Sequence, residues 1–226
     1  VEIVREEDDF TQIKRLHSAA AIILPPATPA PPAARLPVVR DYIPPPIAQR
    51  ILEGRSSFIG EHRHVTVLFV DYDHDPQVGS ALQTYLGQVI EVIYRYDGTL
   101  NKVDMGDKGS KYIILFGAPI GHEDDEIRAL RCAWELSQLD VPARIGVNSG
   151  FVFCGQVGSA VRQEYTVMGD AVNMAARLMQ YASAGEIIVS DSTYRPATAA
   201  FQWGEPQSIT VKGKTVPVTI RQLSGT

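Results

Sequence analysis

Hydrophobic and polar positions divide the chain into a first part with little periodicity and a longer remainder, from residue 64 onward, with dense and regular patterning. In the remainder, short apolar runs bounded by Gly or Asp alternate with longer stretches that carry apolar residues at helical spacing. The short runs are typical of buried strands, and the longer stretches are typical of amphipathic helices. The pattern therefore predicts alternating strands and helices around one main core.

The expected elements follow in the order strand, helix, strand, strand, helix, strand, with a further helix and strands appended. This order is that of the ferredoxin-like βαββαβ unit, so we expect an α+β fold of this type. Strands are predicted over 65–71, over a hairpin at 99–116 that turns at Gly106 and Gly109, over 143–158 as one strand entering a second, and over 164–168, 185–191 and 208–223. Helices are predicted over 78–98, 123–139 and 170–182.

The segments before this region have a different character. Residues 1–22 alternate loosely enough to form a strand or two but are too short to fold alone, so they are either the end of a preceding domain or a strand that docks on the main one. Pro and Ala dominate residues 23–40, which predicts an extended, semi-rigid linker. Residues 41–61 are expected to form a short helical lead-in. The main domain is then expected over 62–224.

Composition and charge narrow the class of protein. A chain of 226 residues can bury a full core, and a net charge of −5 gives no electrostatic reason to expect a nucleic acid or an anionic membrane as partner. No apolar run approaches the roughly 20 residues of a membrane helix, so we expect a soluble, cytoplasmic fragment. Cys132 and Cys154 lack metal-ligand spacing and are expected to be buried free thiols in a reducing compartment.

Two aspartates are candidate metal ligands. Asp71 ends an apolar strand, and Asp107 lies in the turn of the hairpin that the fold would place beside that strand. Two carboxylates at one end of a sheet suit a hard ion such as magnesium, especially when substrate phosphates complete its shell. The alternative is that each Asp merely ends its strand, since Asp is common in turns.

A second set of candidates lies around the segment EYTVMGDAVNMAARLM. Asn173 and Arg177 are four residues apart and share one face of the predicted helix, where an amide and a guanidinium can stabilise charge on a transferring phosphorus. The alternative is an ordinary solvated stripe. Lys102 alone could be a strand-edge charge that discourages aggregation, and Thr166 an ordinary strand residue.

Four segments in the same order and register carry a family resemblance: VTVLFVD, NKVDMGDKGSKYIILFGAP, RIGVNSGFVFCGQVG and EYTVMGDAVNMAARLM. Together they resemble the class III nucleotidyl cyclase catalytic domain, and most of all that of the soluble, bicarbonate-responsive adenylyl cyclases. The similarity covers roughly residues 63–223. It implies a site between two head-to-tail domains, one holding two metal ions and its partner holding the base and the transition state.

The resemblance also implies a role for each matching residue. Asp71 and Asp107 match the metal-binding aspartates for two divalent ions, magnesium or manganese; Lys102 and Thr166, with Val103 and Val167 beside them, match the base-reading residues; and Asn173 and Arg177 match the pair that stabilises the transition state. The implied reaction is attack of the ribose 3′ hydroxyl of ATP on the α-phosphorus, giving 3′,5′-cyclic AMP and pyrophosphate.

Base choice has a physical reading. A Lys donor with a hydroxyl acceptor fits adenine, which presents an acceptor at N1 and a donor at N6. Lys102 with Thr166 therefore favours ATP as the nucleotide. Within the family, Thr at this position implies stimulation by bicarbonate. The implied partners are ATP, bicarbonate and a second cyclase domain, either another copy or the first half of a tandem enzyme.

The sequence departs from the family pattern at the metal motif. Asp71 is followed by YDHDP instead of an xxGFT stretch, and Asp107 comes five residues after Lys102 instead of four. Both features resemble the second cyclase half of tandem enzymes, in which case residues 1–22 would be the last strands of the first half. The alternative function is thus a catalytically incomplete half that supplies residues to, or regulates, a separate metal-binding half.

Two other classes with related topology fit less well. A ferredoxin-like RNA-binding module would need exposed aromatics on its middle strands and a basic surface, and this chain has neither a paired aromatic motif in the hairpin nor the charge. A diguanylate cyclase would carry a GG[DE]EF turn, where this chain has DMGDKG.

Overall fold

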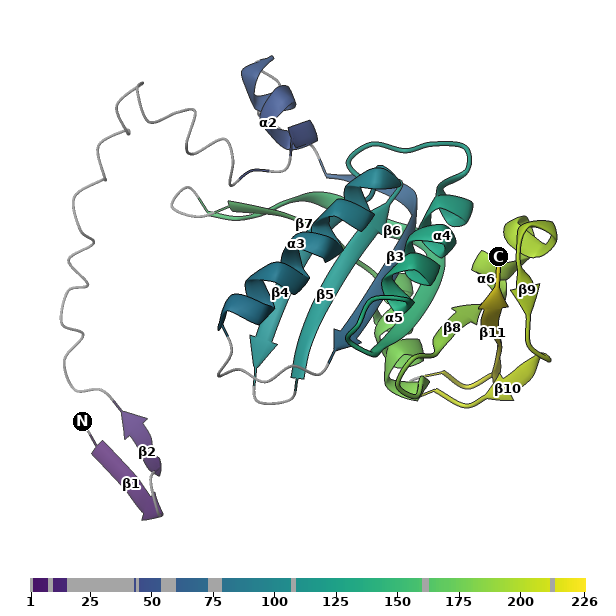
Figure 1. Ribbon diagram of the computed structural model, residues 1–226. Helices are drawn as coiled ribbons and strands as arrows, with labels where there is room; N and C mark the ends of the chain where they lie inside the picture. The colour runs from purple at the N-terminus through teal and green to yellow at the C-terminus, as the bar shows by residue number, and fades with distance from the viewer. Residues whose placement is uncertain are drawn as a thin grey trace. The chain divides into compact units, whose positions relative to one another are not determined.

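The computed structural model describes residues 2–7, 10–15, 43, 45–53, 60–72, 79–106, 109–159, 163–211 and 214–226. Its contacts divide the chain into two units, Val1–Tyr42 and Ile43–Thr226. The first unit contains an antiparallel hairpin of β1 (Glu2–Glu7) and β2 (Phe10–Arg15), in line with the strand or two that its pattern predicts (Figure 1). The predicted linker at 23–40 lies outside the described residues.

The second unit contains the predicted alternation of helices and strands. Its helices are α2 (Pro45–Leu52), α3 (Gly79–Arg95), α4 (Asp125–Ser137), α5 (Asp170–Tyr181) and α6 (Asp191–Ala197), with a 3-10 turn at Thr198–Ala200. Its strands are β3 (Glu61–Tyr72), β4 (Thr99–Gly106), β5 (Gly109–Phe116), β6 (Ala143–Gly158), β7 (Gln163–Met168), β8 (Ile187–Ser190), β9 (Gln202–Trp203), β10 (Gln207–Ile209) and β11 (Val218–Gly225). Among the described helices, none combines the length and apolar character needed to cross a membrane.

Strand order confirms the predicted fold class. Strands β4, β5, β3 and β6 are neighbours in that order, and each pairs antiparallel with the next. With α3 between β3 and β4, and α4 between β5 and β6, these elements form the ferredoxin-like unit. The sheet continues through β8, parallel to β6, to β11 and β10. Strand β7 pairs with the distal part of β6.

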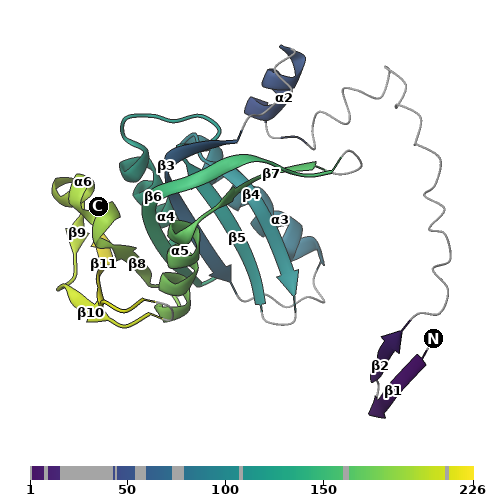
Figure 2. The same cartoon turned by 180° about the vertical axis from the view of Figure 1, so that it is seen from behind.

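The two faces of the sheet are covered by different elements. Alternate residues of a strand point to opposite faces. On β3, Leu68 and Val70 pack in the cluster that includes α3 and α4, whereas Val65 and Val67 pack with β7 and α5. Figure 1 shows the sheet from the side of α3 and α4, and Figure 2 shows β7 and α5 on the opposite side. That opposite side carries the candidate site and is called the α5 face.

The structure differs from the sequence prediction in the long strand and at the C-terminal end. Residues 143–158 form one strand, β6, because β3 pairs with it as far as Cys154 and β7 pairs with it from Phe153 onward. Helix α6 and strand β9 were not predicted. Helix α6 has only seven residues and contains Pro196, and β9 has two residues, so neither produces a periodic signal.

Candidate functional site

Lys102 owes its position to an irregularity in β4. Between Leu100 and Lys102 the register against β5 shifts by one residue, which places Lys102 opposite Ile113. Directly paired residues of neighbouring strands lie on the same face of a sheet, and Ile113 packs in the cluster of the α5 face. If the pairing continued regularly from Leu100, Asn101 would oppose Ile113 and Lys102 would oppose Tyr112, which packs with α3 and α4. The bulge therefore moves an exposed cationic residue to the α5 face.

Thr166 comes near Lys102 through a hydrogen bond between the residues that precede them. The side-chain amide of Asn101 on β4 donates to the backbone carbonyl oxygen of Tyr165 on β7, at an N–O distance of 3.0 Å. Lys102 and Thr166 directly follow these two residues. The hydrogen bond therefore brings together the segments of β4 and β7 that carry these two residues, although the strands are far apart in the sequence.

The two valines expected beside that pair have different environments. Val167 is 6% exposed and packs with β3 and α5 in the cluster of the α5 face. Val103 is 39% exposed and is paired with Tyr112, on the side of α3 and α4. The structure thus places Val167 beside the candidate site and the side chain of Val103 on the other face of the sheet.

Helix α5 carries Asn173 and Arg177 one turn apart, on one face, as the spacing predicts. Asn173 is exposed, and Arg177 is partly buried. The Nη1 atom of Arg177 is buried and has no hydrogen-bond partner among the described residues. A buried, charged donor without an acceptor is costly to keep. An anionic ligand on this face would satisfy it by a charge-assisted hydrogen bond.

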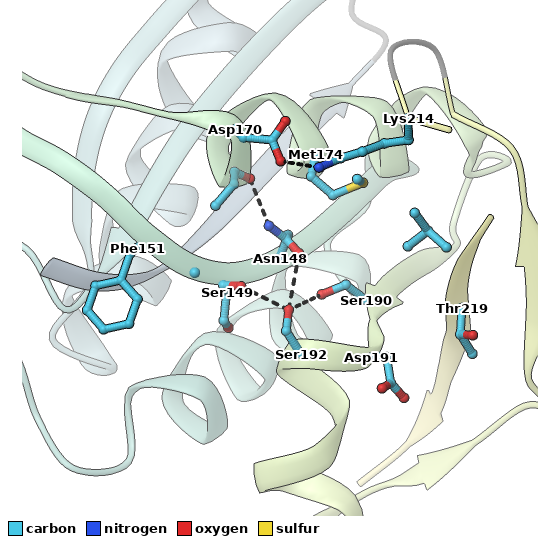
Figure 3. A pocket seen from close by; sticks show the side chains of 13 residues that line it. Asn148, Ser149, Phe151, Asp170, Met174, Ser190, Asp191, Ser192, Lys214 and Thr219 are labelled. Carbon is cyan, nitrogen blue, oxygen red and sulfur yellow. Dashed lines mark hydrogen bonds and ion pairs between the residues drawn. The ribbon is translucent and has the colours of Figure 1, made fainter. Parts of the chain in front are cut away.

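Strand β6 fixes the position of α5 by two contacts. A Cβ atom added at Gly146 would lie 2.2 Å from the backbone nitrogen of Met179 and 2.3 Å from the carbonyl oxygen of Ala175, so only glycine permits this approach of helix to strand. Further along β6, the side-chain amide of Asn148 donates to the carbonyl oxygen of Ala171 at 2.9 Å (Figure 3). The orientation of the face that carries Asn173 and Arg177 is therefore set by β6.

A pocket of about 470 Å³ opens beside the start of α5 (Figure 3). Its wall is part polar and part apolar, and several of its polar groups bond to one another. The hydroxyl of Ser192 donates to the Oδ1 atom of Asn148 at 3.3 Å and lies 2.9 Å from the hydroxyl of Ser190, and Lys214 forms an ion pair with Asp170. This network secures the first turn of α5 from β6, β8 and the segment before β11.

Asp71 is the second-last residue of β3, close to its predicted end, and its carboxylate is already paired. The side chain is 5% exposed and forms an ion pair with Arg144 at the start of β6. The second predicted ligand, Asp107, lies outside the described residues. Over the part of the chain that is described, no group of three or more His, Cys, Asp or Glu residues is placed to hold a metal ion. Magnesium needs carboxylate oxygens that are free to coordinate it, so the described surroundings of Asp71 do not fit a bound divalent ion.

Both cysteines are buried and free, as predicted. Burial raises the pKa of the Cys154 thiol to about 11, and burial also raises the pKa of the Cys132 thiol. At neutral pH both thiols therefore stay protonated, and a protonated thiol is a poor nucleophile. The chemistry of the site has to come from its other side chains.

Sequence reasoning missed the residues that position the site: Asn101, Arg144, Gly146 and Asn148. Two of them left a signal. Asn148 is a polar residue inside an apolar strand, which is unusual unless its side chain is hydrogen-bonded. Gly146 interrupts the same strand, which often marks a close approach of another backbone. The bulge at Asn101 and the pairing of Arg144 depend on strand register, which the pattern alone does not supply.

Comparison with known proteins gives a consistent result. A family model described as "Adenylate and Guanylate cyclase catalytic domain" matches residues 59–222. Adenylate cyclase type 10 of Homo sapiens is 41% identical over 138 residues, which cover 56% of this chain and 9% of that protein. The chain therefore spans about a tenth of the length of the mammalian relatives that it matches.

Solved structures agree with the family match. The crystal structure of the guanylyl cyclase Cya2 has a TM-score of 0.67 and 29% identity, covering 74% of this chain and 94% of that one. The adenylyl cyclase CyaB from P. aeruginosa has a TM-score of 0.63 and 26% identity, covering 74% of this chain and 97% of that one.

Proposed function

Because this chain belongs to the family of adenylate and guanylate cyclase catalytic domains, of the class III type that its motifs resemble, we propose that it forms cyclic AMP from ATP at an interface between two such domains. Domains of this family act as dimers, bind nucleotide and generally use divalent metal ions. The observation that carries the proposal is the unpaired, buried Nη1 of Arg177, one turn from Asn173 on the α5 face. We assign the catalytic domain to residues 62–224, with residues 1–22 as the end of a preceding cyclase half.

The proposed reaction is an intramolecular displacement. The ribose 3′ oxygen forms a bond to the α-phosphorus, the bond from that phosphorus to the bridging oxygen of the β-phosphate breaks, and pyrophosphate leaves while the 3′ hydroxyl proton is released. Negative charge on the oxygens around phosphorus grows in the transition state, where the Arg177 guanidinium stabilises it. The amide of Asn173 orients the ribose so that the 3′ oxygen faces the α-phosphorus.

Base selection rests on the two strands that the Asn101–Tyr165 hydrogen bond joins. The ammonium group of Lys102 donates to adenine N1, and the hydroxyl of Thr166 accepts from the amino group at N6. Guanine presents a donor at N1 and an acceptor at O6, so Lys102 would face a donor. The chain should therefore prefer ATP to GTP, as the similarity to adenylate cyclase type 10 supports.

The pairing of Asp71 with Arg144 favours a second candidate function. In this version the chain is the half that supplies the base-reading and transition-state residues, and a separate half supplies the metal-binding carboxylates. The two versions differ in what the chain does alone: a complete homodimer forms cyclic AMP by itself, and the incomplete half does so only in a mixture.

Purified protein incubated with ATP and either Mg²⁺ or Mn²⁺, with cyclic AMP measured by chromatography, tests both versions. We expect cyclic AMP from the chain alone or from its mixture with a metal-binding cyclase domain, and bicarbonate should raise the rate over chloride at equal pH and ionic strength. Absence of product in every mixture, with no binding of an ATP analogue, would contradict the proposal. An unchanged rate with bicarbonate would remove only the bicarbonate response.

Substitution of Lys102 by Ala should reduce the preference for ATP over GTP by about 10- to 100-fold, the range for losing one hydrogen bond from a charged donor. The measurement is kcat/KM for the two nucleotides in the active mixture. Arg131→Ala is the matched control, because Arg131 is an exposed cation on α4, on the other side of the sheet. Equal selectivity of the Lys102 variant and wild type would exclude Lys102 from the base pocket.

A further inference from the structure

Four charged residues form a row across the α5 face at one end of the sheet. Asp104 on β4 is paired in register with Lys111 on β5, Lys111 with Asp71 on β3, and Asp71 with Arg144 on β6. Because these strands are neighbours in the order β4, β5, β3, β6, the four residues stand side by side on one face. Their charges alternate in sign along the row, so every inner member lies between two residues of opposite charge.

Asp71 is the most buried residue of the row, so its negative charge is the most costly to leave uncompensated. Its side chain is 5% exposed, whereas the side chain of Arg144 is 44% exposed. A buried carboxylate needs a compensating charge, and the guanidinium of Arg144 supplies one. A divalent ion at Asp71 would have to displace that guanidinium and then stay close to the two cationic neighbours of Asp71 in the row, Lys111 and Arg144, which repel it.

We propose that Asp71 is the structural anion of this charge row and not a metal ligand, so that the divalent ions of the two-domain site are held by carboxylates of the partner domain. The statement about the partner rests on the proposed function, and the statement about Asp71 does not. In this arrangement the guanidinium of Arg144, and not a metal ion, neutralises the carboxylate of Asp71. The partner that fits is a cyclase domain whose matching aspartates face no such cations.

The proposal is tested by titrating Mn²⁺ into the full chain, with the free ion measured by electron paramagnetic resonance, in the presence and absence of a non-hydrolysable ATP analogue. Loss of a group that supports a metal ligand typically costs about 10- to 100-fold in metal affinity, and loss of the ligand itself should cost no less. Asp71→Asn should therefore leave Mn²⁺ binding at the wild-type level under both conditions. A loss of affinity of about tenfold or more in this variant would overturn the proposal.

The variant Arg144→Gln tests the same proposal through an expected gain of Mn²⁺ binding. Removal of the guanidinium should create Mn²⁺ binding that is at least about tenfold tighter than in wild type and that disappears again in the double variant with Asp71→Asn. Arg128→Gln is the matched control, because Arg128 lies on α4, away from the row, and the change removes its ion pairs with Asp97 and Asp124. If Arg144→Gln folds and gains no Asp71-dependent binding, Arg144 is not what excludes the ion.

Failure of this inference can be told from failure of the proposed function. The titration needs no turnover, so a chain that forms no cyclic AMP in any mixture still reports on Asp71. Conversely, Mn²⁺ binding that depends on Asp71 in the wild-type chain would refute the structural role and leave the cyclase assignment standing.

Discussion

Replacing Arg177 with Ala is expected to lower kcat for cyclic AMP formation by about 100-fold, the range for removing one preorganised electrostatic stabiliser of a transition state. KM for ATP should change little, because the guanidinium is matched to charge that develops only during phosphoryl transfer. The unpaired Nη1 of Arg177 supports this expectation, since the side chain has no described structural partner to lose.

The substitution Arg177→Lys separates charge from shape. Lys retains the positive charge but cannot present the planar, forked donors of a guanidinium, so we expect an intermediate kcat. Both variants should unfold at the wild-type temperature within a few degrees, which circular dichroism would confirm. An increase in KM with kcat unchanged would instead mean that Arg177 binds the ground state and transition state equally.

The side-chain amide of Asn173 is expected to contribute to the same step. If Asn173 orients the ribose, its loss should lower kcat as well, but the exposed position of Asn173 makes it replaceable by an ordered water. The effects of Asn173 and Arg177 should not add, because two groups that act on one transition state are coupled.

Much of the fold could be predicted from the sequence, because a helix or strand with one buried and one exposed face shows a strong hydrophobic period. Strand β3 ends at Tyr72, one residue beyond the predicted bound, and α5 begins at Asp170 and ends at Tyr181, within one residue of the prediction. The α+β class followed from the order of such elements. Short elements such as α6 contribute too few residues to show a period, so they could only be found in three dimensions.

The candidate site was predictable only as far as its chemistry is local. The spacing of Asn173 and Arg177 places them on one helical face whatever the tertiary structure. The state of Asp71 is not local, because it depends on Arg144, 73 residues away along the chain. The face of Lys102 is not local either, because a single bulge residue, Asn101, decides it. The features that could not be predicted are those that depend on the pairing register of the strands.

The pairing register of the strands also determines where the side chains of the site are placed. The position of Lys102, the charge row and the approach of α5 all depend on the register of β4, β5, β3 and β6, since a shift by one residue would exchange the two faces of a strand. A change that displaces α5 from β6 should therefore damage the site as well as the core.

Gly146→Ala is the variant that tests this coupling, and we expect it to lower the free energy of unfolding by about 3 kcal/mol, at the upper end of overpacking effects in cores. For a chain of this size that corresponds to a fall in Tm of roughly 10 °C. The added Cβ would lie 2.2 Å from the Met179 nitrogen and 2.3 Å from the Ala175 oxygen. Both are backbone atoms of one helix, so no side-chain rotation relieves the clash and α5 must move as a body.

Gly87→Ala is the matched control, since a Cβ at Gly87 on α3 would meet no atom within 4 Å. Alanine is a better helix former than glycine, so this variant should gain up to about 1 kcal/mol. Opposite signs for the two substitutions in urea unfolding would show that close packing, and not loss of glycine as such, governs residue 146. If Gly146→Ala unfolds within about 0.5 kcal/mol of wild type, then α5 adjusts without cost, and the argument that β6 sets the orientation of Arg177 is wrong.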